Sequence, residues 1–222
     1  MKESRYYFII AIIIVILIAS GCKDEVGSTT NLDLDPAKMP TMVSHNVQTL
    51  LSDSGTTRYR ITTKTWLAYE NREDPHWIFP DGLIAEELEN DANFNVKMSM
   101  KCDSAHYSRN ERMLNLVGNI TIHDNDGGEI TCDSAYYDEE KRLWSLNSMV
   151  TITKSDGSKI ETNQMYWDRK TNKYYSDSFI RMQQADKILE GHGYVSNDDM
   201  TNYTVRKVQA IVPVNDTKFP SM

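Results

Sequence analysis

The sequence predicts an all-β domain, an elongated twisted β-jelly-roll made of stacked hairpin repeats of about 30 residues. Three observations predict it: a pattern that recurs along the chain at a fixed period, apolar and polar residues that alternate within each period, and turn-forming residues between the alternating segments. The chain has 222 residues, with 24 Lys and Arg against 32 Asp and Glu, and a formal net charge of −8. That balance excludes a general nucleic-acid-binding protein, because such a protein needs a basic surface to neutralise phosphates.

The period is clearest when the chain is aligned with itself so that residue 102 falls on residue 132. Residues 102–107 (CDSAHY) then match residues 132–137 (CDSAYY) and residues 162–167 (TNQMYW). A repeat of this length indicates one supersecondary unit per period, which buries its apolar face only when neighbouring units stack on it.

Within each unit the local period is two. From residue 114 to 122 the even positions are mostly apolar and the odd positions are more polar, and residues 144–152 repeat the pattern. Such alternation predicts half-buried strands, because successive side chains of a strand point to opposite faces. The polar segments at 108–111, 138–141 and 168–172 predict the turns that join the strands.

Stacked units place equivalent residues in ladders along the interior. In the third copy the alignment shortens by two residues, so that Ile188 follows Ile160 and Tyr194 follows Tyr166. We predict that the ladders line a long apolar groove; the alternative is that they form an ordinary core. The predicted groove residues are Leu114, Leu116, Ile120, Ile122, Trp144, Leu146, Val150, Ile152, Tyr174, Ile180 and Met182.

The N-terminal segment predicts export and lipid anchoring. The apolar run at 6–19 follows a basic start and is shorter than the roughly 20 residues that a membrane-spanning helix needs. It ends in Ala-Ser-Gly before Cys22, which resembles the lipobox of bacterial lipoproteins. We therefore predict a signal peptide at 1–21, lipidation of Cys22 and a flexible lipidated tether at 22–40. The alternative is a short membrane anchor with a chance cysteine.

The repeat resembles the OstA-like fold of lipopolysaccharide transport proteins. Residues 105–107 (AHY) and 114–122 (LNLVGNITI) carry this resemblance most clearly. Within that fold the chain resembles the LptC family. Residues 51–61 are similar to its first strand, 77–82 (WIFPDG) to its Pro-Gly segment, and 191–197 to its closing strands.

The resemblance implies a transport protein and not an enzyme. It implies an OstA-like β-jelly-roll domain at 41–214, which leaves 215–222 as a disordered tail. The apolar groove would cover the acyl chains of lipopolysaccharide, and no cofactor is expected. The expected location is the periplasmic face of the inner membrane, where Cys22 would hold the chain.

Two departures from the better-known family members leave an alternative open. Those members hold the membrane with a spanning helix, whereas this chain is predicted to use Cys22. In addition, Lys23-Asp24-Glu25 resembles a signal that sends some lipoproteins to the cell surface. The alternative is thus a surface-exposed β-solenoid lipoprotein, in the outer membrane, that binds a glycan or a protein.

Both edges of an open sheet are predicted partner sites, because unpaired backbone groups can extend into another sheet. The resemblance implies that the first edge meets inner-membrane ABC transporter subunits with periplasmic jelly-rolls. It implies that the last edge meets a periplasmic bridge protein of LptA type. The predicted contact residues are Val47, Tyr59 and Ile61 at the first edge and Tyr203, Val205 and Val208 at the last.

No motif points to catalysis or to a metal. The sequence has no Gly-rich phosphate loop, no His-Glu-x-x-His and no Cys-x-x-Cys. Residues 124–127 weakly resemble a calcium loop, but Ala135 stands where the loop needs glutamate, so we predict no metal site. Cys102 and Cys132 are repeat equivalents and are expected on neighbouring stacked strands, either as small buried side chains or as a disulfide.

Overall fold

The computed structural model describes residues 38–53, 55–90 and 93–213. The chain divides into the units Met1–Lys38 and Met39–Met222, and the second unit, described here by itself, contains all the strands. The predicted signal peptide, Cys22 and the tail at 215–222 lie outside the described residues, as does the tether apart from residues 38–40.

The described residues form thirteen β-strands and no helix, which confirms the all-β prediction. The strands are β1 (Met42–Asp53), β2 (Thr56–Tyr69), β3 (His76–Phe79), β4 (Leu83–Leu88), β5 (Val96–Cys102), β6 (Ser104–Ser108), β7 (Met113–Asp124), β8 (Glu129–Asp138), β9 (Leu143–Thr153), β10 (Lys159–Asp168), β11 (Lys173–Gln183), β12 (Lys187–Asn197) and β13 (Tyr203–Pro213).

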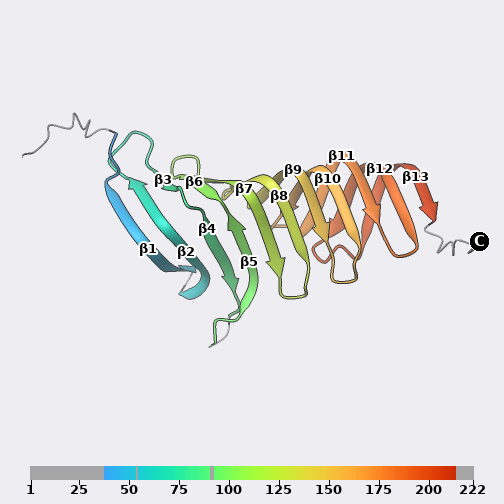
Figure 1. Ribbon diagram of the computed structural model, residues 1–222, viewed down its shortest axis with the longest axis horizontal. Helices are drawn as coiled ribbons and strands as arrows, with labels where there is room; N and C mark the ends of the chain where they lie inside the picture. The colour runs from blue at the N-terminus through green and yellow to red at the C-terminus, as the bar shows by residue number, and fades with distance from the viewer. Residues whose placement is uncertain (1–37, 54, 91–92, 214–222) are drawn as a thin grey trace, which may run out of the picture. The chain divides into compact units, whose positions relative to one another are not determined.

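All the strands belong to one antiparallel sheet. From β7 to β13 each strand pairs with the next one along the chain, so the C-terminal half is a row of hairpins (Figure 1). In the N-terminal half β7 pairs with β6 through its first part and with β5 through its second, and β2 pairs with β1, β3 and β4. Within the described residues β1 pairs only with β2, and β13 only with β12, so these two strands are the edges.

The period found in the sequence is present in the strands themselves. β7, β9 and β11 begin at Met113, Leu143 and Lys173, and the predicted turns fall within one residue of the observed ones. The predicted shortening of the third copy by two residues is wrong. Because Ile152 pairs with Ile160 whereas Met182 pairs with Leu189, the third copy is shorter by one residue.

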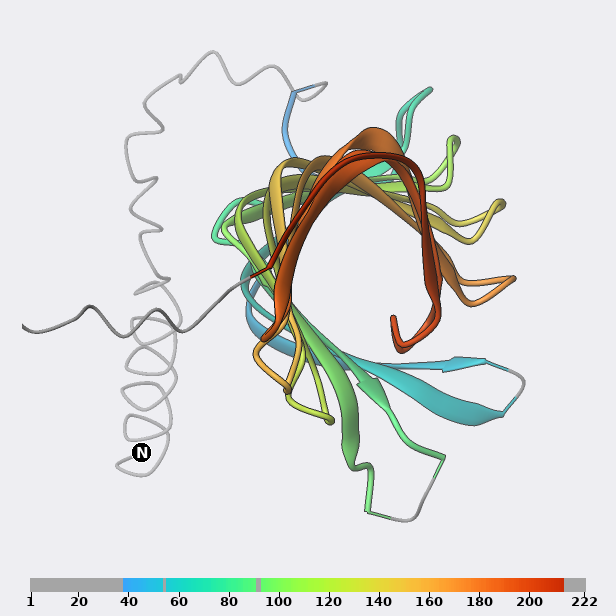
Figure 2. The same ribbon diagram turned by 90° about the vertical axis from the view of Figure 1, so that its right-hand side faces the viewer.

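Each long strand bends near its middle, and the bend separates two walls that face each other. The pairing register of β7 with β8 shifts between Val117 and Ile120, where Gly118 takes φ = 80° and Asn119 takes φ = 43°. Positive φ angles and extra residues of this kind bend a strand sharply. Figure 2 shows the strands of this unit curling about a common axis as a result.

From β3 to β6 the bend interrupts the strands completely, whereas β1 and β2 are continuous. β3 and β4 are separated at residues 80–82, and β5 and β6 are separated at Asp103. Gly82 lies in the first of these breaks with φ = 74°, and a Cβ atom there would come within 2.0 Å of the Cys102 carbonyl oxygen. Only glycine fits this junction, where β4 turns away from β3 to join the opposite wall.

Each wall carries one continuous row of inward-facing residues at paired positions of neighbouring strands. The aromatic row, on the wall that contains β3 and β6, is Trp77, Tyr107, Leu114, Tyr137, Trp144, Trp167, Tyr174, Ser196 and Tyr203. The aliphatic row, on the wall that contains β4 and β5, is Ile61, Ala85, Met100, Ile122, Ile130, Ile152, Ile160, Met182 and Leu189.

Candidate functional site

A cavity of about 400 Å³ lies between the two walls in the N-terminal half. One side of it is the first part of the aromatic row, and the other side comes from β2, β4 and β5. Its apolar and aromatic lining residues are Leu51, Tyr59, Ile61, Trp77, Phe79, Leu83, Ala85, Met98, Met100, Tyr107, Leu114, Tyr137 and Trp144. We call this space the chamber. Its size and its mostly apolar lining are those of a site for an apolar ligand.

Stacked rings hold the aromatic side of the chamber in place. The ring centroids of Trp77 and Tyr107 are 5.1 Å apart, and those of Tyr137 and Trp144 are 4.8 Å apart. The Trp77 indole N–H donates a hydrogen bond to Glu70 Oε1 at 2.7 Å, and Trp66 meets Trp77 edge-on at 5.0 Å. The surface offered to a ligand is therefore fixed before the ligand arrives.

Charged groups in the chamber lining are already partnered. The Tyr107 hydroxyl donates to Glu139 Oε2 at 3.0 Å, and Arg112 Nε donates to the same oxygen at 3.2 Å. The hydrogen bond from Arg112 is the largest effect on Glu139 and holds the pKa of its carboxyl below the ordinary value. The Glu139 carboxylate therefore stays ionised, and it forms a polar edge of the otherwise apolar chamber lining.

Further along the sheet the inward-facing residues of the aromatic row are more deeply buried. Trp167 and Tyr174 are 4% and 5% exposed, whereas Trp77, Tyr107 and Tyr137 of the chamber are half-buried. Burial raises the pKa of the Tyr174 hydroxyl well above its ordinary value.

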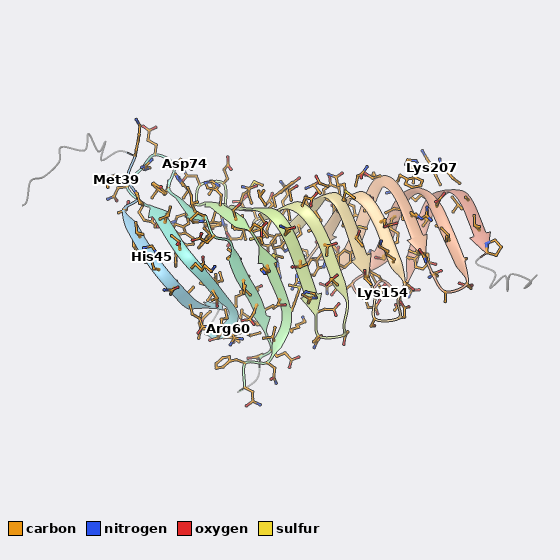
Figure 3. The ribbon with its side chains drawn as sticks, viewed as in Figure 1. Met39, His45, Arg60, Asp74, Lys154 and Lys207 are labelled. Atoms are coloured by element: carbon orange, nitrogen blue, oxygen red, sulfur yellow. The ribbon has the colours of Figure 1, made fainter. Side chains whose placement is uncertain are left out.

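The loop between β12 and β13 helps to close the C-terminal half. Its Met200 is 7% exposed within the core, and Trp167 donates to Asp198 Oδ1 of the same loop at 2.9 Å. Lys154, labelled in Figure 3 between β9 and β10, donates to the Met200 carbonyl oxygen at 3.4 Å. The loop thereby joins strand ends from two hairpins.

The comparison with known families agrees with this architecture. The family described as "Lipopolysaccharide-assembly, LptC-related" matches residues 7–210. The chain belongs to the LptC family. Members of this family are components of lipopolysaccharide transport and are associated with the periplasmic side of the inner membrane. It is not an enzyme family. No curated protein matches the chain.

The chamber does not coincide with the set of groove residues that we predicted. Of the eleven predicted residues only Leu114 and Trp144 line the chamber. Ile122 and Tyr174 border a second, more polar hollow of about 390 Å³ in the C-terminal half. The other seven are at most 3% exposed and line neither space: Leu116, Ile120, Leu146, Val150, Ile152, Ile180 and Met182. The walls close over these side chains, so the alternative of an ordinary core describes this part of the protein.

The structure also corrects one predicted edge. Tyr59 pairs with Leu51 of β1 and with Glu87 of β4, and Ile61 likewise has partners on both sides. Their strand is therefore interior, and both side chains line the chamber instead. Val47 lies on the edge strand β1, and Tyr203, Val205 and Val208 lie on the edge strand β13, as expected. Whether these four contact partners stays a prediction.

Several chamber residues were missed although the period contained them. Tyr107, Tyr137 and Trp167 occupy equivalent positions in successive repeats, and all three belong to the aromatic row. Tyr107 and Tyr137 line the chamber, and Trp167 borders the second hollow. Applying the ladder argument to the first strand of each hairpin as well as to the second would have found them.

Neither a metal site nor a disulfide is present among the described residues. Residues 38–53, 55–90 and 93–213 contain no group of three or more His, Cys, Asp or Glu arranged to hold a metal. Asp124 Oδ1 instead accepts the backbone N–H of Asp126 and of Gly128, as in an ordinary turn. Cys102 and Cys132 are free and buried. The expectation that they lie on neighbouring strands is wrong, because Cys102 is in β5, Cys132 is in β8, and β7 runs between these two strands. The same described residues offer no candidate for a membrane-spanning helix.

Proposed function

We propose that this LptC-family chain covers the acyl chains of lipopolysaccharide in the chamber. In this role it accepts the lipid from the inner-membrane ABC transporter and passes it to the periplasmic bridge protein. The observation that carries the proposal is the apolar chamber between two walls whose other inward-facing side chains are mostly buried. Removing a methylene group from water is worth about 0.8 kcal/mol, so contact area alone holds several acyl chains.

The two edges support a direction of transfer. β1 and β13 each pair on one side only among the described residues, and β13 exposes Val208, Ile211 and Val212. The chamber lies in the half that contains β1, and Leu51 of that strand lines it. We place the transporter at β1, where lipid enters beside the chamber, and the bridge protein at β13.

Membrane attachment through Cys22 is part of the same proposal. The small residues before Cys22 and the short apolar run support lipidation, and the family's location supports the inner membrane. A lipid anchor followed by the tether would keep the chamber near the transporter.

A photo-crosslinking residue inserted at single positions tests lipid binding. At Leu114, which lines the chamber, we expect a lipopolysaccharide adduct in cells that export the lipid. The matched controls are Leu146, which is sealed in the core, and Met149, which is 76% exposed on the outside. Adduct at Met149 equal to that at Leu114, or none at Leu114 during active export, would contradict the proposal. The same residue at Val47 and Val208 identifies the protein at each edge.

A further inference from the structure

One ion pair connects the two walls across the interior. Arg169, directly after β10, donates to Glu87 Oε2 at 2.8 Å and to Glu87 Oε1 at 3.1 Å. Glu87 belongs to β4, which lies five strands away from β10 in the order of the sheet. The two side chains are only 20% and 14% exposed. Both hydrogen bonds come from the same guanidinium nitrogen, Nη2, and a hydrogen bond between two charged groups is stronger than one between neutral groups.

This pair lies at the boundary between the chamber and the second hollow. Glu87, Met98 and Arg169 line both spaces. The chamber side is apolar, whereas the second hollow is bordered by acidic and amide side chains, including Asp124, Asn125 and Asp198. A lipid that moves from the chamber into the second hollow therefore passes Arg169 and Glu87.

Both partners have a second contact that remains when the pair separates. Lys97 Nζ lies 3.5 Å from Glu87 Oε1, so this carboxylate keeps a cationic neighbour. The Arg169 guanidinium lies over the Trp167 ring, 4.5 Å from its centroid, and this ring keeps it positioned. Arginine forms charge-assisted hydrogen bonds with phosphate as well as with carboxylate, so a phosphate group can replace Glu87.

We propose that Glu87 and Arg169 form a latch that confines lipid to the chamber, and that a phosphate on the lipid opens it by taking Arg169 from Glu87. The inference rests on the proposed function and adds a checkpoint to it. Only a lipid that carries both acyl chains and a phosphate releases the latch, and an uncharged lipid stays in the chamber.

The test uses the full chain with a photo-crosslinking residue at Leu114, in the chamber, or at Asn125, in the second hollow. The probes are phosphorylated lipid A and the same lipid after its phosphates have been removed. For the dephosphorylated lipid, Glu87→Gln should raise the ratio of Asn125 adduct to Leu114 adduct at least about fivefold over the unsubstituted latch. Arg169→Gln is an independent second variant and should do the same.

Glu86→Gln is the matched control. Glu86 is the neighbouring residue on the same strand, but it pairs with Arg60 of β2 at 2.5 Å within a single wall. The substitution should leave the ratio unchanged. With the latch intact, phosphorylated lipid should give a higher ratio than dephosphorylated lipid, and this difference should vanish in Arg169→Gln.

The outcomes separate the two proposals. Adduct at Leu114 with a ratio that neither Glu87→Gln nor Arg169→Gln changes overturns the latch and leaves the chamber function intact. A phosphate effect that persists in Arg169→Gln overturns the assignment of Arg169 as the phosphate-binding group. Absence of any adduct at Leu114 overturns the proposed function itself.

Discussion

The two halves of the sheet share the same inward rows but use them differently. In β10–β13 most inward-facing residues of the two rows are buried, whereas residues from β1 to β9 border the chamber between the walls. The residue types do not differ enough to explain this, since aromatic side chains occupy the same row throughout. What differs is the bend. The strands from β7 onward pass through the bend with a register shift, whereas β3 and β4 are interrupted at residues 80–82 and β5 and β6 at Asp103. The interruption lets two strands leave for opposite walls, and space remains between them.

The largest effect should come from a substitution at that interruption. Gly82→Ala combines a left-handed backbone with a Cβ placed 2.0 Å from a backbone carbonyl oxygen, so we expect a loss of at least about 3 kcal/mol in the free energy of unfolding. Urea denaturation followed by far-UV circular dichroism measures it.

Gly157→Ala is the control in the C-terminal half. Gly157 has φ = 82° in the turn between β9 and β10, and a Cβ atom there has nothing within 4 Å. Only the backbone cost applies, about 1 kcal/mol. Equal effects at the two glycines would mean that the close approach at Gly82 does not hold the junction.

Core truncations should give the next largest difference between the halves. Leu146 has no exposed surface, so Leu146→Ala should lower the free energy of unfolding by about 3 kcal/mol through lost burial and a cavity. Leu114 is a half-buried leucine that already borders the chamber, so Leu114→Ala should cost about 1 kcal/mol. Similar losses at both positions would show that the chamber wall is packed as tightly as the core.

The sequence predicted the strands and the aliphatic row because their physical signals are local. Even-numbered apolar positions alternate with polar ones in β7 and β9, and polar segments mark the turns between hairpins. The aromatic row was only partly predicted, since Tyr136 and Tyr137 are adjacent and both aromatic. Alternation gives no contrast there, although Tyr137 lines the chamber while Tyr136 does not. The predicted alignment of the third copy was wrong for the same reason. Ile188 and Leu189 are adjacent and both aliphatic, so the sequence does not distinguish which of them faces inward.

The presence of an open chamber could not be predicted from a local sequence pattern. It depends on which strands are neighbours, and alternation in β2 is the same whether that strand is an edge or is covered by β1. Likewise the contact of Glu87 with Arg169 joins residues 82 positions apart in the chain. Strand order and long-range contacts are properties of the whole sheet, and a single sequence carries no direct signal of either.

The smallest expected effect concerns how far the chamber extends toward the bend of the strands. Cys102 belongs to the N-terminal half and Cys132 to the C-terminal half, yet they are only 3% and 4% exposed. If both halves are sealed at the bend, neither thiol should react with iodoacetamide in the native protein at pH 8, and both should react in urea. Peptide mapping by mass spectrometry distinguishes the two sites. Faster native modification of Cys102 than of Cys132 would show that the chamber extends to the bend.

The same burial has a consequence for stability at alkaline pH. Burial raises the pKa of the Cys132 thiol to about 11 from its ordinary value of 9, and it also raises the pKa of Cys102. The unfolded chain releases the Cys132 proton at a lower pH than the folded chain does, so the free energy of unfolding should fall as the pH rises from 9 to 11. Cys132→Ala removes this contribution, whereas the tyrosines that titrate in the same range remain. The curves of unfolding free energy against pH should therefore diverge above pH 9, with the unsubstituted protein falling more steeply. Parallel curves would mean that Cys132 ionises as easily in the folded protein as in the unfolded chain, and that water reaches the interior around Cys132.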